Sequence, residues 1–240
     1  MVNLAAARAR LIVALDVPSA ADAIALADNI GDAAEFYKIG LELFAAGDGR
    51  QLVAEFKERG LRVFADLKLF DVPATVARAA KQIAGSGADF LTVHGNDAIM
   101  QAAAEAKGET LKILAVTALT SLDEGDLRDL GFACDASALV LSRARRALQC
   151  GCDGVVSSGL EVEELRRDAG EKLIIVSPGV RPVANRPADD QKRTASAAQI
   201  IRAGADYLVV GRAVRDAPDP RAAAQNIVGE IAAAMQDSPA

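Results

Sequence analysis

The sequence predicts a single (β/α)8 TIM barrel of the α/β class that spans residues 1–240. Three observations predict this fold. The chain has 240 residues, close to the roughly 250 residues typical of such barrels. Short runs of Val, Ile, Leu and Ala alternate about eight times with Ala-rich stretches of helical periodicity. These alternations show no break in composition, which favours one closed barrel over an open doubly wound sheet.

The expected strands are short and almost continuously apolar, as is typical of parallel strands that are covered on both faces. Eight such runs are present: Leu11–Val17, Phe36–Glu42, Arg62–Leu69, Phe90–His94, Leu111–Leu119, Gly154–Ser158, Leu173–Val180 and Tyr207–Val214. An open dinucleotide-binding sheet is the structural alternative. It would require a Gly-x-Gly-x-x-Gly turn after the first strand, where this chain has Asp16-Val17-Pro18-Ser19.

The expected helices have recognisable ends. Ser19 is a plausible N-cap with Asp22 three residues later, and a glycine after a helix end is the usual left-handed cap. The predicted helices are Ser19–Ile30, Ala74–Gly85, Ser137–Cys150, Ser196–Ala203 and Pro220–Met235. Helix-Gly-strand junctions occur at Gly60, Gly85-Ser86-Gly87, Gly151 and Gly204, and the last three have a small residue and an Asp directly before the next strand.

The charge and the termini limit the possible partners. A net charge of −6 disfavours a nucleic-acid partner, because no basic field is available for a phosphate backbone. A small anionic substrate remains possible at a local cluster of Lys and Arg. We find neither a signal peptide nor a membrane-spanning run, so we expect a cytoplasmic protein with no membrane partner. The odd number of cysteines, three, does not suggest a disulfide framework.

Active sites of such barrels lie at the carboxyl ends of the strands. The polar residues expected at those ends are Asp16, Lys38 with Glu42, Asp66 with Lys68, His94, Thr117 with Thr120, Ser157 with Ser158, Arg181, and Arg212. His94 receives no role, and the sequence does not decide whether the two serines line the site.

The third expected strand carries two charged residues that an apolar barrel strand should not contain. Asp66 and Lys68 are two residues apart, so their side chains point the same way. Asp71 follows at the strand end, and Lys38 lies on the neighbouring strand. Burying one charge alone costs several kcal/mol, whereas an alternating Lys-Asp-Lys-Asp array keeps all four groups ionised. A purely structural ion-pair cluster is the alternative.

This array suits some reactions and excludes others. Two lysines would repel a divalent metal, and the sole histidine, His94, lies on another strand, so no Ser-His-Asp set is expected. A lysine held as an ammonium between carboxylates is a poor Schiff-base nucleophile. It is a good general acid and can stabilise a developing carbanion. A fixed carboxylate nearby would crowd a substrate carboxylate and favour its departure as CO2.

The last two strands predict a phosphate site, since the loops after strands seven and eight usually hold phosphate in these barrels. Gly211 lets backbone N–H groups approach an anion, and Arg212 can bind it in a bidentate manner. Arg181 lies in the turn Pro178-Gly179-Val180-Arg181-Pro182, and Gln191 lies in a loop long enough to act as a lid. Solvated arginines without a ligand are the alternative.

Together these segments resemble the orotidine 5′-phosphate decarboxylases of the bacterial type, over nearly the whole chain. The resemblance rests on Ala14-Leu15-Asp16, Tyr37-Lys38-Ile39-Gly40, Asp66-Leu67-Lys68-Leu69-Phe70-Asp71-Val72-Pro73-Ala74-Thr75, Val116-Thr117-Ala118-Leu119-Thr120-Ser121, Pro178-Gly179-Val180-Arg181-Pro182, Asp189-Asp190-Gln191-Lys192-Arg193 and Val210-Gly211-Arg212. Many members of the family have His where Phe70 stands and Asn where Ala74 stands, which concerns only local packing.

The resemblance implies a role for each matching residue. Lys68 would protonate C6 of the pyrimidine after CO2 leaves, Asp66 would lie beside the departing carboxylate, and Lys38 and Asp16 would reach the ribose. Asp71 and Thr75 would act across a homodimer interface, and Val72 joins the substrate-binding set. The remaining contacts would be Thr120 to the pyrimidine edge, and Arg181, Gln191, Gly211 and Arg212 to the phosphate. The family uses neither a cofactor nor a metal.

Two other functions remain open at this point. A metal-dependent hexulose-phosphate synthase or keto-gulonate-phosphate decarboxylase resembles this chain at Asp-x-Lys-x-x-Asp, but has Glu where Lys38 stands. A catalytically inactive nucleotide-binding protein is the second alternative, and retention of all four charged residues argues against it. Activity in excess EDTA distinguishes the first alternative, and nucleotide binding without turnover would indicate the second.

Overall fold

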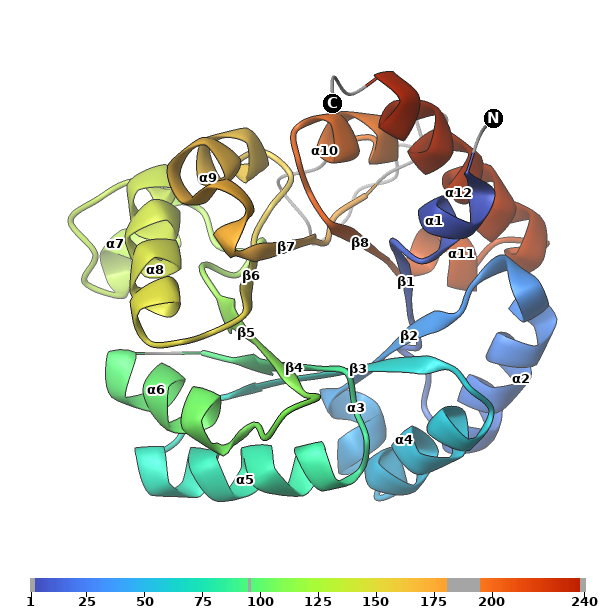
Figure 1. Cartoon of the computed structure of the whole chain (residues 1–240), viewed down its shortest axis with the longest axis horizontal. Coiled ribbons are helices and arrows are strands. Elements are labelled where there is room, and N and C mark those ends of the chain that lie inside the picture. Colours follow the sequence, from blue (N-terminus) through green and yellow to red (C-terminus); the bar gives the residue numbers. More distant parts are fainter. Residues whose placement is uncertain (1–2, 95, 181–194, 238–240) are drawn as a thin grey trace.

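The structure is a computed structural model that describes residues 3–94, 96–180 and 195–237. Eight parallel strands form a closed barrel in chain order, which confirms the predicted fold class (Figure 1). Pairing of Leu11 on the first strand with Leu208 on the last closes it. The strands are β1 (Leu11–Ala14), β2 (Phe36–Gly40), β3 (Arg62–Leu69), β4 (Phe90–Val93), β5 (Lys112–Val116), β6 (Gly154–Val156), β7 (Ile174–Ser177) and β8 (Tyr207–Val210). That residues 1–240 form one domain stays a prediction.

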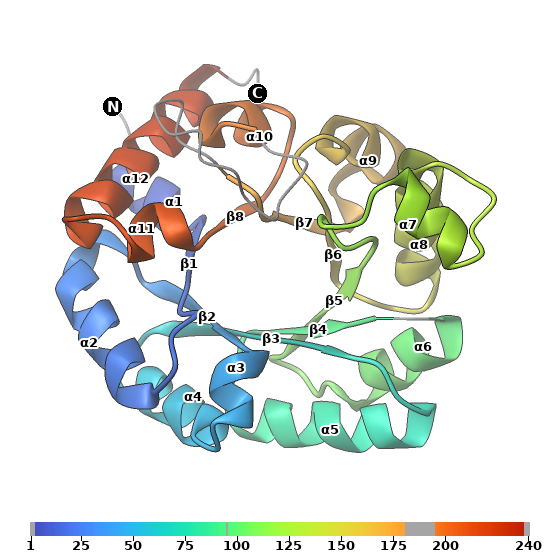
Figure 2. The ribbon, with the colours of Figure 1, turned by 180° about the vertical axis from the view of Figure 1, so that it is seen from behind.

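Helices surround the barrel on its outside, as both views of the ribbon show (Figures 1 and 2). The first helix, α1, packs beside the last, α12, so the two ends of the chain lie on the same side of the barrel. The helices are α1 (Leu4–Arg8), α2 (Ala20–Ile30), α3 (Leu41–Ala45), α4 (Gly49–Glu58), α5 (Pro73–Gly85), α6 (Asp97–Ala106), α7 (Glu124–Asp129), α8 (Ala136–Gln149), α9 (Val162–Ala169), α10 (Ala197–Arg202), α11 (Arg212–Arg215) and α12 (Pro220–Asp237), with 3-10 turns at Gly31–Ala33 and Gly170–Lys172.

The predicted helices are confirmed within one or two residues at each end, and Ser19 caps α2 by accepting from the backbone N–H of Asp22. Several predicted strands are too long, however. The clearest error is Tyr207–Val214, because the strand ends at Val210 and residues 212–215 form α11. One turn of helix with a single buried residue, Val214, has no periodicity that separates it from the end of a strand.

The barrel interior is filled by side chains that alternate along the strands. One apolar cluster collects Ile12, Ala14, Phe36, Phe64, Phe90, Leu114, Val176 and Val209. Because strand side chains alternate between faces, residues two positions further along project toward the same interior at its carboxyl end. Asp16, Lys38, Asp66 and Thr92 each follow one of these residues by two positions. The interior layer at the carboxyl ends of the strands is therefore polar, and the layers beneath it are apolar.

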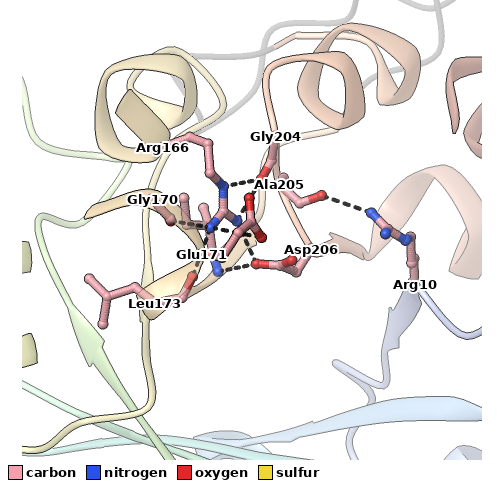
Figure 3. A network of polar contacts seen from close by, with 9 residues as sticks. Arg10, Arg166, Gly170, Glu171, Leu173, Gly204, Ala205 and Asp206 are labelled. Carbon is pink, nitrogen blue, oxygen red and sulfur yellow. Dashed lines mark hydrogen bonds and ion pairs between the residues drawn. The ribbon is translucent and has the colours of Figure 1, made fainter. Parts of the chain in front are cut away.

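The opposite end of the barrel is held by a repeated arrangement. All four predicted glycine caps adopt left-handed backbone angles, with φ of 75° at Gly60, 85° at Gly87, 79° at Gly151 and 106° at Gly204. After the last of these, the Asp206 carboxylate accepts from Ile175 N at 2.8 Å and from Arg166 Nη2 at 2.7 Å (Figure 3). One acid thus joins the backbone of β7 to a cation of α9.

The same contact occurs at two other strand starts. Asp89 Oδ2 accepts from Val63 N at 2.7 Å and from Lys57 Nζ at 2.8 Å. Asp153 Oδ2 accepts from Ile113 N at 2.8 Å and from Lys107 Nζ at 2.6 Å. We call Asp89, Asp153 and Asp206 the basal acids. Each fixes the start of its own strand to the strand before it.

Candidate active site

Four charged side chains meet at the carboxyl ends of β1, β2 and β3, and we call Asp16, Lys38, Asp66 and Lys68 the charged network. Lys38 Nζ lies 2.8 Å from Asp16 Oδ1 and 3.5 Å from Asp66 Oδ2. Lys68 Nζ lies 2.9 Å from the same Asp66 oxygen. The structure therefore brings together the Asp66–Lys68 pair and the Lys38 cation, which the sequence predicts in one site.

Asp66 is the most enclosed acid of this network, with its side chain 13% exposed. Burial alone would raise the pKa of this carboxyl. The positive charges of Lys38 and Lys68, together with hydrogen bonds from Lys68 and Thr92, outweigh burial and hold the pKa below its usual value. Asp66 is consequently ionised at neutral pH, as a fixed negative charge beside two ammonium groups.

Thr92 also belongs to this site and is absent from the residues that the sequence predicts there. Its hydroxyl is fully buried, donates to Asp66 Oδ1 at 2.8 Å and accepts from the backbone N–H of Lys68 at 3.0 Å. Thr92 is the one hydroxyl in the apolar strand Phe90–Val93, two residues beyond an interior phenylalanine. That position was a usable signal, because it marks the barrel mouth.

Lys68 has an unusual backbone. Its φ of 47° is the only positive value at a described non-glycine residue, and the pairing of β3 with β4 shifts register between Ala65 and Leu69. Such a conformation costs on the order of 1–3 kcal/mol and persists only when its surroundings enforce it. The Thr92 hydroxyl on the Lys68 N–H does so here. The side chain is still 41% exposed, so its ammonium can be reached from the barrel mouth.

Gly40 leaves the space that the Lys38–Asp16 pair occupies. A side-chain carbon at Gly40 would lie 3.2 Å from Lys38 Nζ and 3.3 Å from Asp16 Oδ1. These distances are shorter than ordinary contacts between such atoms. Glycine at the end of β2 therefore permits the two charged groups to meet directly above it.

Asp71, Val72 and Thr75 lie beyond the end of β3, where α5 begins. Asp71 is exposed, and its carboxylate accepts from the N–H of Val72 at 2.7 Å. Among the residues that the structure describes, Asp71 forms no ion pair with Lys38 or Lys68. Within one chain the expected four-residue array thus lacks Asp71, because the chain has already turned outward at Phe70, which is 70% exposed.

The expected phosphate residues fall into two groups. Gly211 and Arg212 form the N-cap and first residue of α11, directly after β8, and Arg212 is exposed. Arg181 and Gln191 lie outside the described residues. Thr120 is half-buried in the turn after β5. The strand order places β8 next to β1, so Gly211 lies close to Asp16.

His94 lies at the end of β4, with its ring edge-on to Phe70 at 5.9 Å between centroids. Burial lowers the pKa of the imidazole, and the positive charges of Arg143 and Lys68 lower it further. The group is therefore neutral at pH 7. In the described part of the chain, no group of three or more His, Cys, Asp or Glu side chains is arranged to hold a metal ion.

Comparisons with known proteins match nearly the whole chain. Residues 9–227 match the family described as "Orotidine 5′-phosphate decarboxylase / HUMPS family". The orotidine 5′-phosphate decarboxylase of Methylococcus capsulatus is 62% identical over 222 residues, which is 92% of this chain and 91% of that protein. That of Rhodopseudomonas palustris strain HaA2 is 51% identical over 95% of this chain and 96% of its own length. The crystal structure of the Lactobacillus acidophilus enzyme superposes with a TM-score of 0.81 at 33% identity, covering 93% of this chain and 99% of that one.

Proposed function

The chain belongs to the orotidine 5′-phosphate decarboxylase / HUMPS family and decarboxylates orotidine 5′-phosphate to uridine 5′-monophosphate (UMP), and we propose that its charged network carries this reaction without a cofactor. This is a carboxy-lyase reaction of pyrimidine nucleotide biosynthesis. The observation that carries the proposal is the contact of Lys68 with Asp66 at 2.9 Å, at the mouth of a closed barrel where such enzymes hold their substrates.

Each member of the network has a separate task. Asp66 is a buried anion, so a substrate carboxylate placed beside it is repelled and leaves as CO2. The electron pair left on C6 of the pyrimidine is stabilised by the Lys68 ammonium, which then donates its proton to that carbon. Lys38, the second cation beside Asp66, helps to keep that carboxylate ionised. Together with Asp16, Lys38 binds the ribose hydroxyls. No step requires a Schiff base, because both lysines are paired with carboxylates.

The remaining contacts position the nucleotide. Thr120 meets the edge of the pyrimidine, and Gly211 and Arg212, together with Arg181 and Gln191, bind the phosphate. Because the phosphate is remote from C6, its binding energy can be used to hold the base against Asp66 and Lys68 in the transition state.

The metal-dependent members of the wider family are the main alternative, and Lys38 argues against them. Its ammonium lies within 3.5 Å of both Asp16 and Asp66. It therefore occupies the place between these two carboxylates where a divalent cation would have to bind. A cation placed there would meet a like charge instead of a ligand. The high identity to named orotidine 5′-phosphate decarboxylases favours the same choice.

The test is a spectrophotometric assay of orotidine 5′-phosphate with the purified protein in excess EDTA. We expect the absorbance change of decarboxylation at full rate with and without the chelator. Loss of turnover in EDTA that added Mg²⁺ restores would refute the metal-free reaction. Uridine-nucleotide binding without any turnover would indicate an inactive binding protein.

The active site is completed by a second copy of the chain in our proposal. Asp71 is exposed, and so are its neighbours Phe70 and Val72, at 70% and 63%. Exposed apolar residues around a carboxylate at the barrel mouth favour burial against a partner. Asp71, Val72 and Thr75 would then reach the substrate in the other subunit of a homodimer.

Mixed dimers test this arrangement. Chains with Lys68→Ala and chains with Asp71→Ala are each expected to be nearly inactive alone. Mixing them should regenerate one intact site per heterodimer, so activity should return to roughly a quarter of the wild-type value, because half of the dimers carry one intact site in two. No recovery after proven subunit exchange would refute the shared site.

The location of the protein is also part of the proposal. We assign it to the cytoplasm, where nucleotide precursors are made. Among the residues that the structure describes, no helix has both the length and the apolar composition needed to cross a membrane.

A further inference from the structure

Arg215, in the last position of α11, joins two segments that are far apart in the sequence. Its Nη1 donates to the main-chain carbonyl of Asp16 at 2.7 Å. Its Nε and Nη2 bind both carboxylate oxygens of Asp216 at 2.6 and 2.9 Å. The side chain is only 24% exposed. Asp216 therefore fixes the orientation of the guanidinium, which connects α11, the helix after β8, to the loop after β1.

The Asp16 end of this contact leads directly to the charged network. The Asp16 carboxylate binds Lys38 at 2.8 Å, and Lys38 lies 3.5 Å from Asp66. The N–H of the preceding Leu15 donates to the Lys38 carbonyl at 2.9 Å. The main chain around Asp16 is thus held by β2 on one side and by Arg215 on the other.

The α11 end leads to the residue assigned to the phosphate. Arg212 and Arg215 share one helical turn, in which the N–H groups of Val214 and Arg215 both donate to the Gly211 carbonyl at 2.9 Å. Asp216 N donates to the Arg212 carbonyl at 3.0 Å. Because these bonds make a compact unit, a shift of Arg212 toward an anion also moves Arg215.

We propose that Arg215 is a positioning residue that couples phosphate binding at α11 to the placement of Asp16 and Lys38. This inference rests on the proposed assignment of Arg212 to the phosphate and of Asp16 to the ribose. Binding energy from the phosphate is transmitted through one guanidinium to the main chain that carries Asp16. Precise placement of the network then strengthens contacts made in the transition state.

The chemistry of the contact requires arginine. A planar guanidinium binds a carboxylate with two N–H groups and still has a third nitrogen for the Asp16 carbonyl. A lysine ammonium is a point donor that cannot make both contacts in this geometry. Arg215→Met removes every donor while keeping a long apolar side chain, and Arg215→Lys keeps the charge but loses the fork.

The experiment compares kcat/KM for orotidine 5′-phosphate with that for orotidine, the same nucleoside without phosphate. For Arg215→Met we expect a loss of roughly 10- to 100-fold with the phosphorylated substrate, the size of one lost charge-assisted hydrogen bond. For orotidine we expect a smaller loss, because this substrate carries no phosphate whose binding energy Arg215 could transmit to Asp16. Arg215→Lys should follow Arg215→Met. Equal losses on both substrates, or no loss on either, overturn the coupling.

Two further variants keep the result interpretable. Arg145→Met removes another bidentate surface pair, Arg145 with Asp168 at 2.8 and 2.6 Å, and should leave both kcat/KM values unchanged. Asp216→Asn weakens the contact that orients the guanidinium but keeps Arg215 itself. Its loss of kcat/KM should again be larger for orotidine 5′-phosphate than for orotidine, but smaller than in Arg215→Met. This second variant keeps the test valid even if Arg215→Met does not fold. Wild-type protein that fails to turn over orotidine 5′-phosphate would contradict the proposed function itself, whereas an active wild type with unaffected Arg215 variants contradicts only the coupling.

Discussion

The two ends of the barrel use the same chemical pair, an aspartate with a lysine or arginine, in different ways. Each basal acid accepts from a backbone N–H as well as from a cation, as Asp153 does from Ile113 N and Lys107. Asp66 at the carboxyl end is at least as buried, but its partners are all side chains: Lys38, Lys68 and Thr92.

This difference supports the proposal that the basal acids form structural ion pairs whereas Asp66 forms a reactive one. A carboxylate bonded to the main chain cannot move without disturbing a strand, so the basal acids serve stability. The partners of Asp66 can change their contacts when a substrate arrives, and one of them, Lys68, already has a strained backbone with φ of 47°. Side-chain partners and local strain together are typical of sites where charge must be used rather than merely neutralised.

The largest contrast is expected between two lysines with nearly the same geometry. Lys68 Nζ and Lys57 Nζ lie 2.9 and 2.8 Å from their aspartates. Lys68→Ala should lower kcat by about 10²- to 10⁴-fold, because no other group can deliver the proton. The thermal unfolding midpoint of this variant should change little. Lys57→Ala should keep its activity per folded molecule. Wild-type-like turnover of Lys68→Ala would refute the proton-donor assignment.

The next contrast concerns the acids themselves. Asp153→Asn should lower the free energy of unfolding by about 1.5–3 kcal/mol, since Asp153 accepts charge-assisted hydrogen bonds at a mostly buried position. Its kcat should not change. Asp66→Asn should have the opposite profile, with turnover largely lost and a smaller cost in stability, because Lys38 keeps Asp16 as a partner. Chemical denaturation and the absorbance assay, run on the same preparations, check both. Equal stability losses in the two variants would contradict the distinction.

The sequence predicted the placement of the charged network better than the contacts that support it. Asp66 and Lys68 were identifiable because charges interrupt an apolar strand, and the basal acids because they recur after glycine caps. Thr92 was missed, although its place two residues beyond the interior Phe90 marks the barrel mouth. Its contact with the Lys68 N–H depends on a register shift between β3 and β4, which no local pattern encodes. Arg215 meets Asp16 across 199 residues, and α11 is too short to show periodicity. Glu42, expected at a strand end, is instead exposed in α3.

A smaller effect is expected from the glycine under the network. Gly40→Ala places a carbon 3.2 Å from Lys38 Nζ and 3.3 Å from Asp16 Oδ1, so the pair must shift by a few tenths of an ångström. We expect kcat/KM to fall about tenfold, as for small misplacements of catalytic groups. Gly229→Ala in α12 is the matched control, because nothing lies within 4 Å of the added carbon. It should stabilise the fold by about 0.5–1 kcal/mol without changing activity. Unaltered kinetics in Gly40→Ala would show that the network tolerates displacement.

The smallest expected effect reports the electric field of the site through His94, the only histidine in the sequence, which gives one imidazole resonance in NMR. Burial, Arg143 and Lys68 all lower its pKa, so its midpoint should lie below the roughly 6.5 of an unfolded chain. The neutral form is favoured by folding. Its contribution to stability is therefore complete above pH 6.5 and is lost as the pH falls from there through the folded midpoint. Lys68→Ala should raise the midpoint, because one of the three causes is removed, while Lys57→Ala should leave it unchanged. A midpoint at or above 6.5, or one insensitive to Lys68, would show that the charge of Lys68 does not reach the neighbouring strand.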